Sequence, residues 1–394
     1  MKPLKIIIAG GGTGGHLFPG IAIAQAFTEV NALTRILFVN SGNSFETKTL
    51  AESGFAHQII AVEGIKGRGL RKQMGAALKI PLSILQSWRI ICRFNPDLVI
   101  GVGGYSAGPV VAAAFLLKIP TALHEQNILP GITNRILFYL VNRIYLSYEN
   151  TLAYKNTLAF ENTLAFKNTK ACKRSKKKLV TGNPLRKDII SAVTNAESDQ
   201  KKTFEQNIFT ILILGGSQGA HRINTGVAEA LSFLKPAPRF CFIHQTGQQD
   251  LKMVQKAYQT AKISSTVQAF FNDMGVQYGK ADLIICRAGA TTVAEVTAFG
   301  KGVIFIPFPY AADNHQELNA EALVNAKGAQ MILEKDLNGH LLAQRIMELA
   351  DNPEKIRNMG LAAKQLGHPL ASQTIIEDCY ALLAQKKAAT RNGN

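Results

Sequence analysis

The stretch "KIIIAGGGTGGHLFPG", residues 5–20, joins a short apolar run to a loop made almost entirely of glycine. Gly10, Gly12 and Gly15 satisfy the pattern G-x-G-x-x-G, and the segment 18–27 that follows is typical of a helix. Glycine lets the backbone approach an anion closely, and a helix N-terminus presents unpaired N–H groups to it. The stretch therefore predicts a strand, loop and helix of a Rossmann-like fold, with a phosphate site at the loop.

The second predicted strand argues against a nicotinamide dinucleotide as the ligand. A dinucleotide site needs an acidic residue after this strand, whereas "RILFVNSGNS" (35–44) places Asn40 and Ser41 there. Two further glycine loops follow predicted strands, "GVGGYSAGP" (101–109) and "GGSQGA" (215–220). Several such loops favour a cleft lined by backbone N–H groups that binds phosphorylated ligands rather than a dehydrogenase site.

Short β-branched runs alternate with helix-like segments in two separate parts of the chain. The first set comprises "KIIIAG", "RILFVN", "DLVIGVGG" and "TALHEQ"; the second comprises "FTILILGGSQGA", "FCFIHQTG", "TVQAFF", "DLIICRAGA" and "VIFIPFP". This alternation is typical of parallel α/β sheets, and 394 residues favour two domains. We predict two Rossmann-like domains whose glycine loops face a central cleft.

The domain boundaries follow from changes in pattern along the chain. The stretch before residue 208 is polar and weakly periodic, and "NTLAYK", "NTLAFE" and "NTLAFK" repeat from Asn150 to Lys167, ahead of a basic run. We interpret 150–178 as a surface insertion and favour a solvated loop over lipid contact for its basic run. The expected parts are a first domain 1–183, a linker 184–207, a second domain 208–368 and a final helix with tail 369–394.

The charge balance narrows the class of partner. Forty-four Lys and Arg against 27 Asp and Glu give a net charge of +17, which favours nucleic acid, anionic lipid or phosphorylated substrates. We expect no nucleic-acid partner, because no recognition motif accompanies the basic residues. The five scattered cysteines lack metal-ligand spacing, and no D-x-D motif occurs. No apolar run is long enough to cross a bilayer, so any membrane association is expected to be peripheral.

Residues 71–94 have the pattern of an amphipathic basic helix. Apolar side chains recur at three- and four-residue spacing, at Met74, Leu78, Leu82, Leu85, Trp88 and Ile91. Such a helix either packs its apolar side on the sheet or inserts shallowly into an anionic membrane surface. Periodicity alone leaves both interpretations open.

Several stretches together resemble one family, in the same order along nearly the whole chain. They are "GGTGGHLFPG" (11–20), "GVGGYSAGP" (101–109), "HEQN" (124–127), "TGNPLR" (181–186), "GGSQGA" (215–220), "FFNDM" (270–274), "CRAGATTVAE" (286–295) and "DNHQ" (313–316). The chain resembles the MurG family of UDP-N-acetylglucosamine: N-acetylmuramyl-(pentapeptide) pyrophosphoryl-undecaprenol N-acetylglucosamine transferases. The repeat and basic run before "TGNPLR" lengthen one connection relative to the family.

The resemblance implies an α/β protein with the GT-B glycosyltransferase fold, whose final helix returns to the first domain. It implies inverting transfer of GlcNAc from UDP-GlcNAc to the 4-hydroxyl of MurNAc in lipid I, giving lipid II. Neither a cofactor nor a protein-bound metal is expected. It also implies a peripheral enzyme on the cytoplasmic face of the bacterial plasma membrane, where other cell-wall synthesis and division proteins are candidate partners.

The resemblance also carries over site residues. The implied substrate-binding residues, which form the donor site of the family, are Thr13, Gly14, Gly15, Asn127, Arg186, Ser217, Phe271, Ala290, Thr291, Thr292, Val293, Ala294, Glu295 and Gln316. Loop and helix N–H groups would bind the diphosphate, Glu295 the ribose hydroxyls and Gln316 the sugar, with Phe271 and its backbone beside the uracil. The Gly10–Gly15 loop would admit the pyrophosphate of the lipid acceptor.

The reaction needs a base for the attacking hydroxyl, and His16 is the first candidate because an imidazole transfers protons near neutral pH. His124 and Glu125 are the alternatives, and a purely structural role for His16 stays open. The family's membrane patch falls on Leu78, Leu82, Leu85 and Trp88. The other functions considered are a different GT-B lipid glycosyltransferase, such as one that glucosylates diacylglycerol, and a basic nucleic-acid-binding protein.

Overall fold

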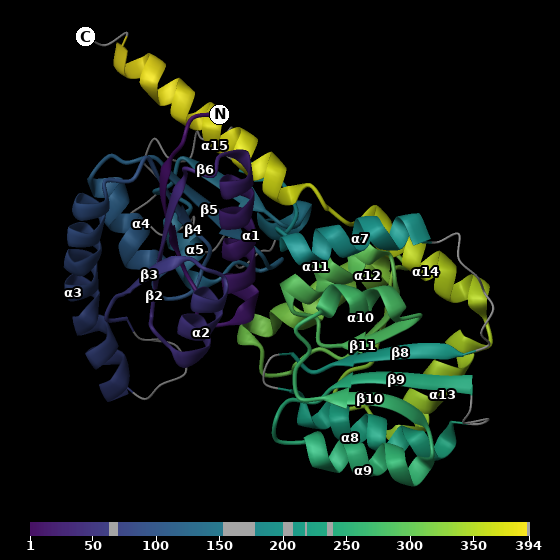
Figure 1. The fold of residues 1–394 in the computed structure, drawn as a ribbon. Helices are drawn as coiled ribbons and strands as arrows, with labels where there is room; N and C mark the ends of the chain where they lie inside the picture. The colour runs from purple at the N-terminus through teal and green to yellow at the C-terminus, as the bar shows by residue number, and fades with distance from the viewer. Residues whose placement is uncertain (63–69, 153–177, 200–207, 217–218, 235–238, 392–394) are drawn as a thin grey trace. The chain divides into compact units, whose positions relative to one another are not determined.

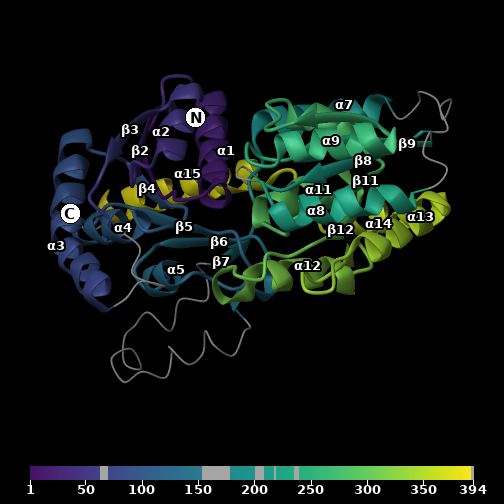
Figure 2. The same cartoon turned by 90° about the horizontal axis from the view of Figure 1, so that it is seen from below.

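A computed structural model describes the part of the chain that comprises residues 1–62, 70–152, 178–199, 208–216, 219–234 and 239–391. The chain divides into two units, and each is described by itself (Figures 1 and 2). The first unit comprises Met1–Arg186 and Pro369–Asn394, and the second comprises Lys187–His368. The predicted insertion lies mostly outside the described residues.

The described part of the first unit contains a parallel sheet with the strand order β3-β2-β1-β4-β5-β6-β7. Its strands are β1 (Lys5–Ala9), β2 (Arg35–Asn40), β3 (Ala56–Ile59), β4 (Leu98–Gly101), β5 (Thr121–Glu125), β6 (Arg143–Leu146) and β7 (Lys178–Val180). Ile6, Ile7 and Ile8 of β1 are fully buried. An uninterrupted apolar run belongs in the middle of a parallel sheet, since helices cover both faces there.

Helices follow the strands of the first unit and cover its sheet. They are α1 (Gly14–Val30), α2 (Ser44–Glu52), α3 (Leu70–Phe94), α4 (Ala107–Leu116), α5 (Ile132–Leu137), the short 3₁₀ helix η1 (Glu149–Leu152) and α15 (Ala371–Arg391). The last helix, α15, lies beside α1 (Figure 1) and buries Ile375 and Ile376 in the same core as β1. The Asp378 carboxylate accepts hydrogen bonds from Arg143 and Tyr145 on β6, both at 2.9 Å. The end of the chain is thus part of the first unit.

The described part of the second unit repeats this plan, with the strand order β10-β9-β8-β11-β12-β13 and every pair parallel. The strands are β8 (Phe209–Leu214), β9 (Phe240–Gln245), β10 (Ser264–Gln268), β11 (Leu283–Cys286), β12 (Gly302–Phe305) and β13 (Gln330–Met331). The sheet lies between helices on both faces, with α8 and α9 on one side and α7, α10 and α11 on the other (Figure 1).

The helices of the second unit include three near its end that follow β12 and β13. The full set is α7 (Lys187–Asp199), α8 (His221–Ala230), α9 (Leu251–Ala261), α10 (Met274–Lys280), α11 (Ala290–Phe299), α12 (His315–Asn325), α13 (Gly339–Ala350) and α14 (Pro353–Gln365), with 3₁₀ turns η4 (Leu231–Phe233) and η6 (Ala312–Asn314). Among the described residues, both units are therefore doubly wound Rossmann-like layers.

Most of the predicted linker 184–207 is helical, since α7 comprises Lys187–Asp199. Helix α7 packs against α10 and α11 and buries Ile189 and Val193. The approach to α10 is close, because a Cβ on Gly275 would lie 2.6 Å from the Cβ of Ala192. The small residues Ala192 and Gly275 allow this close contact, while Ile189 and Val193 are buried one helical turn apart.

Candidate functional site

The predicted site motifs lie at the carboxyl edges of the two sheets. In the first unit the glycine loop follows β1, "GVGGYSAGP" begins in β4, and "HEQN" spans the end of β5. In the second unit "GGSQGA" follows β8 and "CRAGATTVAE" spans the end of β11 and the start of α11. The carboxyl ends of parallel strands share one edge, so each unit gathers its motifs at a single place.

The first half of the opening glycine loop is bonded within the protein. The N–H of Gly10 donates to Val39 O at 3.2 Å, that of Gly11 donates to Gly103 O at 3.3 Å, and that of Gly12 donates to the Glu46 carboxylate. These amides bond within the protein, so the three N–H groups are already occupied. The expectation that the Gly10–Gly15 loop receives pyrophosphate therefore depends on the N–H groups in its second half.

Glu46 holds the opening glycine loop through Gly12 and was not among the predicted residues. Its fully buried carboxylate also accepts from the Ser41 hydroxyl at 2.9 Å and the Asn43 N–H at 3.2 Å. Asn43 in turn caps α2, so the two residues form a capping box. The spacing of Asn43 and Glu46 was the available signal for this arrangement.

Thr13, Gly14 and Gly15 lie where α1 begins. Thr13 is the N-cap, and Gly14 and Gly15 form the first turn. The N–H groups of a first helical turn have no partner further back in the helix, and the helix dipole favours a negative charge beside them. This part of the loop suits a phosphate or pyrophosphate group.

His16 follows on the same turn and is held by two other motifs. Its Nδ1 atom lies 3.0 Å from Oε1 of Gln126. Gly103, with φ +89°, lies against the ring, since a Cβ there would come within 2.7 Å of Nδ1. The glycine loop after β4 therefore leaves room for the His16 imidazole.

His124 and Glu125 are buried and bonded inside the first unit. Both ring nitrogens of His124 have partners, Gly182 O at 3.2 Å and Gln126 Nε2 at 3.1 Å, and burial lowers the pKa of His124 to about 4. Burial raises the pKa of Glu125, whose carboxylate accepts from Asn127 N at 2.9 Å and Asn134 Nδ2 at 2.7 Å. These contacts suit the anchoring of the loop after β5.

Two more predicted residues lie near this edge. Asn127 is partly buried, and its backbone N–H donates to the Glu125 carboxylate. The Arg186 guanidinium lies 4.6 Å from the centre of the Phe18 ring on α1, within the range of a cation–π contact. The first unit thus brings Thr13, His16 and Arg186 to one region around the start of α1.

In the second unit, Gln245 links the loop after β8 to Phe271. Ser217 lies outside the described residues, but the neighbouring Gly216 O accepts from Gln245 Nε2 at 3.1 Å. The N–H of Phe271 donates to Gln245 Oε1 at 3.0 Å. The backbone N–H of Phe271 therefore bonds inside the protein.

The start of α11 carries the six residues of "ATTVAE". Ala290, Thr291 and Thr292 form its first turn, Val293 is buried in the core, and Ala294 is partly exposed. Glu295 lies one turn further and is 8 % exposed. The first-turn N–H groups suit a diphosphate, while the buried Val293 side chain supports packing.

Tyr278 positions the Glu295 carboxylate. The buried Tyr278 hydroxyl donates to Glu295 Oε2 at 2.9 Å, and its ring stacks on Phe299 at 5.2 Å between ring centres. A carboxylate held in this way accepts from vicinal hydroxyls in a fixed orientation. Tyr278 was not predicted, since a tyrosine in a helical pattern gives no signal of its partner.

Gln316 lies at the start of α12 and is held through its oxygen. Its Oε1 atom accepts from the Phe308 N–H at 3.0 Å, which directs the amide nitrogen elsewhere. Arg287 braces the same loop by donating to Ile306 O at 3.0 Å and Pro307 O at 3.1 Å, and it pairs with Glu334. Nothing in the motif "CRAGATTVAE" indicates this supporting role of Arg287.

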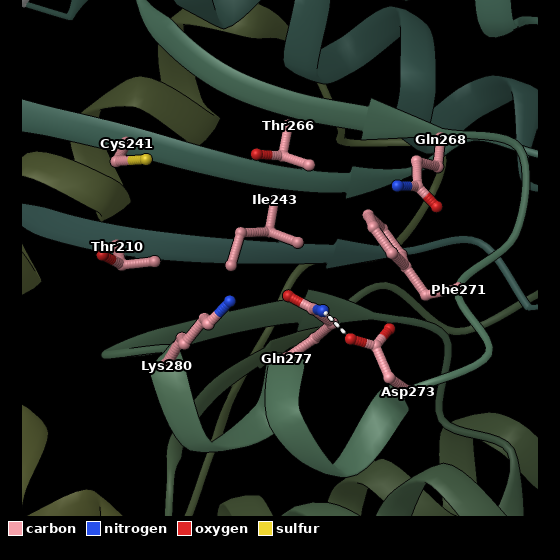
Figure 3. Close-up of a pocket in the computed structure, with 9 residues that line it drawn as sticks. All are labelled: Thr210, Cys241, Ile243, Thr266, Gln268, Phe271, Asp273, Gln277 and Lys280. Atoms are coloured by element: carbon pink, nitrogen blue, oxygen red, sulfur yellow. Dashed lines mark hydrogen bonds between the residues drawn. The ribbon is translucent and has the colours of Figure 1, made fainter.

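A pocket of about 430 Å³ lies against one face of the second sheet, beside α10 (Figure 3). Strand residues Thr210, Ile243 and Gln268 line it together with Phe271 and Lys280. Of the predicted substrate-binding residues that the structure describes, Phe271 alone lines this pocket. The pocket therefore adjoins the expected uracil site and does not contain the other predicted contacts. Within the described ranges, no group of three or more His, Cys, Asp or Glu side chains could hold a metal ion.

Helix α3 has an unusual distribution of side chains. The buried positions include Ser83 and Ser87, whereas Leu82, Leu85 and Trp88 are 49 %, 48 % and 38 % exposed. The side chain of Leu78 lies outside the part of the chain that the structure describes. The helix packs on α4 (Figure 2), where Phe115 and Leu116 are exposed as well. Leu82, Leu85 and Trp88 thus face outward, whereas Ser83, Ser87 and Ile91 face inward.

Models of one protein family match both units. The glycosyltransferase family 28 N-terminal domain matches residues 6–146, and the C-terminal domain of the same family matches residues 210–375. Two parallel-sheet units with glycine loops and helix N-termini at their carboxyl edges define the class. The chain is a glycosyltransferase of family 28 with the GT-B fold.

Curated relatives narrow the class further. Proteins named UDP-N-acetylglucosamine--N-acetylmuramyl-(pentapeptide) pyrophosphoryl-undecaprenol N-acetylglucosamine transferase from Syntrophus aciditrophicus and Geobacter sulfurreducens are 44 % and 42 % identical, and each alignment covers 96 % of this chain and 99 % or 98 % of the relative. The crystal structure of Acinetobacter baumannii MurG is 30 % identical, with a TM-score of 0.74 over 95 % of this chain and 99 % of that one. The chain belongs to the MurG family.

The fold is also shared more widely. UDP-GlcNAc 2-epimerase from Neisseria meningitidis, solved with UDP-GlcNAc bound, is 17 % identical with a TM-score of 0.64 over 96 % of this chain and all of that one. At this identity the likeness concerns the fold alone.

Proposed function

We propose that this protein transfers GlcNAc from UDP-GlcNAc to the 4-hydroxyl of MurNAc in lipid I, with inversion, and so forms lipid II. The observation that carries the proposal is the convergence of three motifs of the first unit on His16, at a helix N-terminus suited to pyrophosphate. Full-length similarity to named transferases of this reaction supports it.

In this mechanism His16 is the general base. It takes the proton of the 4-hydroxyl as that oxygen attacks C1 of GlcNAc, and the bond from C1 to the UDP oxygen breaks with its electron pair on the diphosphate. His124 and Glu125 support the loop instead, because both are buried and bonded within the protein. The first turn of α1 would bind the acceptor pyrophosphate.

The second unit supplies the groups for the sugar donor. The first-turn N–H groups of α11 and the glycine loop after β8 stabilise the charge that develops on UDP. Glu295 accepts from the ribose hydroxyls, and Gln316 offers its amide nitrogen to the sugar because Phe308 holds its oxygen. Phe271 lies beside the uracil.

The test is UDP release from UDP-GlcNAc with and without a lipid I analogue, alongside UDP-Glc and UDP-GalNAc. We expect release that depends on the acceptor and strongly prefers UDP-GlcNAc, because buried polar groups that bond one sugar reject another that leaves them unpaired. Release from UDP-Glc onto diacylglycerol would show a different lipid glycosyltransferase, and release that ignores the acceptor would contradict the proposal.

We further propose that α3 and the end of α4 contact the cytoplasmic face of the plasma membrane. The outward Leu82, Leu85 and Trp88 would enter the interface, with Lys79 and Arg89 on the same helix beside anionic headgroups. None of the described helices is long and apolar enough to span a bilayer. This proposal makes the association peripheral.

Replacing Leu82 or Trp88 by glutamate is expected to weaken binding to phosphatidylglycerol vesicles at least about tenfold, since burial of one such side chain contributes about 1.5–3 kcal/mol. Vesicle flotation measures this, and turnover with a short-chain soluble acceptor should persist. The matched control is Leu361→Glu on α14, a leucine that is 52 % exposed in the second unit. Equal flotation of all three variants, or flotation that does not depend on anionic lipid, would contradict the membrane assignment.

A further inference from the structure

A continuous chain of hydrogen-bonding groups runs from the backbone of Gly182 to the His16 ring. Nε2 of His124 lies 3.2 Å from Gly182 O, and Nδ1 of His124 lies 3.1 Å from Nε2 of Gln126. The Gln126 Nε2 atom also donates to Val102 O at 2.8 Å. At the other end of the same amide, Oε1 lies 3.0 Å from His16 Nδ1.

The direction of each bond follows from the group at the far end. The Gly182 carbonyl can only accept, so Nε2 of His124 carries a hydrogen. The His124 ring is neutral, because complete burial lowers its pKa to about 4, and its Nδ1 therefore carries a lone pair. The Gln126 amide nitrogen donates one hydrogen to that lone pair and the other to Val102 O. Its oxygen can only accept from His16.

We propose that Gln126 is a positioning residue that holds His16 in the tautomer with the hydrogen on Nδ1 and the lone pair on Nε2. The inference rests on the proposed role of His16 as the base. In a neutral imidazole, the hydrogen bond made by one nitrogen decides which nitrogen is protonated. Gln126 acts through His16 and does not touch the substrate.

The surroundings make this orientation hard to lose. Gln126 is 1 % exposed and His124 is fully buried. A flipped Gln126 amide would turn its oxygen toward the Val102 carbonyl and the His124 lone pair, leaving three acceptors together without a hydrogen. Gly103 packs against the His16 ring on another side. The carbonyls of Gly182 and Val102 thus determine, through His124 and Gln126, which ring nitrogen of His16 carries the hydrogen.

The tautomer can be measured directly by NMR of the full-length protein with ¹⁵N-labelled histidine. Long-range ¹H–¹⁵N spectra distinguish protonated from unprotonated ring nitrogens, and a His16→Gln variant assigns the signals. The wild type is expected to show a protonated Nδ1 and an unprotonated Nε2 for His16. A wild-type His16 protonated on Nε2 would overturn the proposal without any variant.

Gln126→Met, which keeps the side-chain length but removes both polar atoms, is expected to shift His16 toward the other tautomer. Turnover with the lipid I analogue should fall about 10- to 100-fold, because a general base contributes about 10²–10⁴-fold and depends on its tautomer. The KM for UDP-GlcNAc should change little. Gln58→Met on β3, an exposed glutamine, is the matched control for the chemical change.

His124→Phe tests the chain one step further from the base. It removes the lone pair that pins Gln126, so we expect a smaller loss of turnover in the same direction. The double variant with Gln126→Met should be no worse than Gln126→Met alone, because both act through one chain. Thermal melting shows whether either variant is unfolded, and the wild-type spectrum stays decisive if one is.

The outcomes separate this proposal from the proposed function. Wild-type enzyme that releases no UDP in the presence of the lipid I analogue would refute the function. An active wild type with an unchanged tautomer and unchanged turnover in Gln126→Met would leave the function intact and refute the role of Gln126.

Discussion

Replacement of His16 by alanine is expected to lower turnover with a lipid I analogue at least about a hundredfold, the lower end of the loss that follows removal of a general base. Binding of UDP should persist, since the groups proposed for the uridine and diphosphate lie in the second unit. Steady-state UDP release gives the turnover, and titration calorimetry gives the affinity for UDP.

The control for this variant is His57→Ala, a histidine on the outer strand β3, which should keep full turnover. If His16→Ala turned over lipid I at close to the wild-type rate, His16 would have no part in proton transfer. The glycine loop would then serve only to bind the acceptor, and its histidine would be structural.

Replacement of Glu295 by glutamine is expected to weaken UDP binding about 10- to 100-fold. Hydrogen bonds to a charged group contribute about 1.5–3 kcal/mol each, and a neutral amide loses part of the contribution for both ribose hydroxyls. The preference for UDP over 2′-deoxy-UDP should shrink at the same time, because the same carboxylate meets the 2′-hydroxyl. Calorimetry with both nucleotides measures the two effects.

Tyr278→Phe separates orientation from charge at this position. It removes only the hydroxyl that donates to Glu295, so we expect a smaller loss of UDP affinity than for Glu295→Gln. Glu354→Gln on α14 is the matched control, since that glutamate is exposed. Undiminished preference for UDP over 2′-deoxy-UDP in Glu295→Gln would show that another residue binds the ribose.

The predicted Rossmann-like fold is confirmed because its signals are local. In a strand, the uninterrupted apolar run from Ile6 to Ile8 puts apolar side chains on both faces, which predicts a sheet covered by helices on both faces. The glycine loop and the helix follow within the same stretch. The helix within the predicted linker was not expected. Helix α7 is held by burial of Ile189 and Val193 against α10 and α11, which are far from it in the sequence.

The site motifs were recognisable, whereas the partners of their side chains were not. "HEQN" is typical of the family, yet nothing in these four residues indicates that Gln126 contacts both His16 and His124. Nor does any local pattern indicate the hydrogen-bond partners of Gln245, Tyr278 and Arg287. Their hydrogen bonds join strands and helices that the chain connects only through long excursions.

By itself, the sequence determined the class of fold, the positions of the glycine loops after the strands and the family, because these depend on short stretches whose residue types restrict the backbone. Tertiary structure alone decided which amides of the glycine loop are already bonded, which side of α3 faces outward and which side chain meets the His16 ring. Each of these depends on groups far apart in the chain that meet only when the parallel strands align their carboxyl ends.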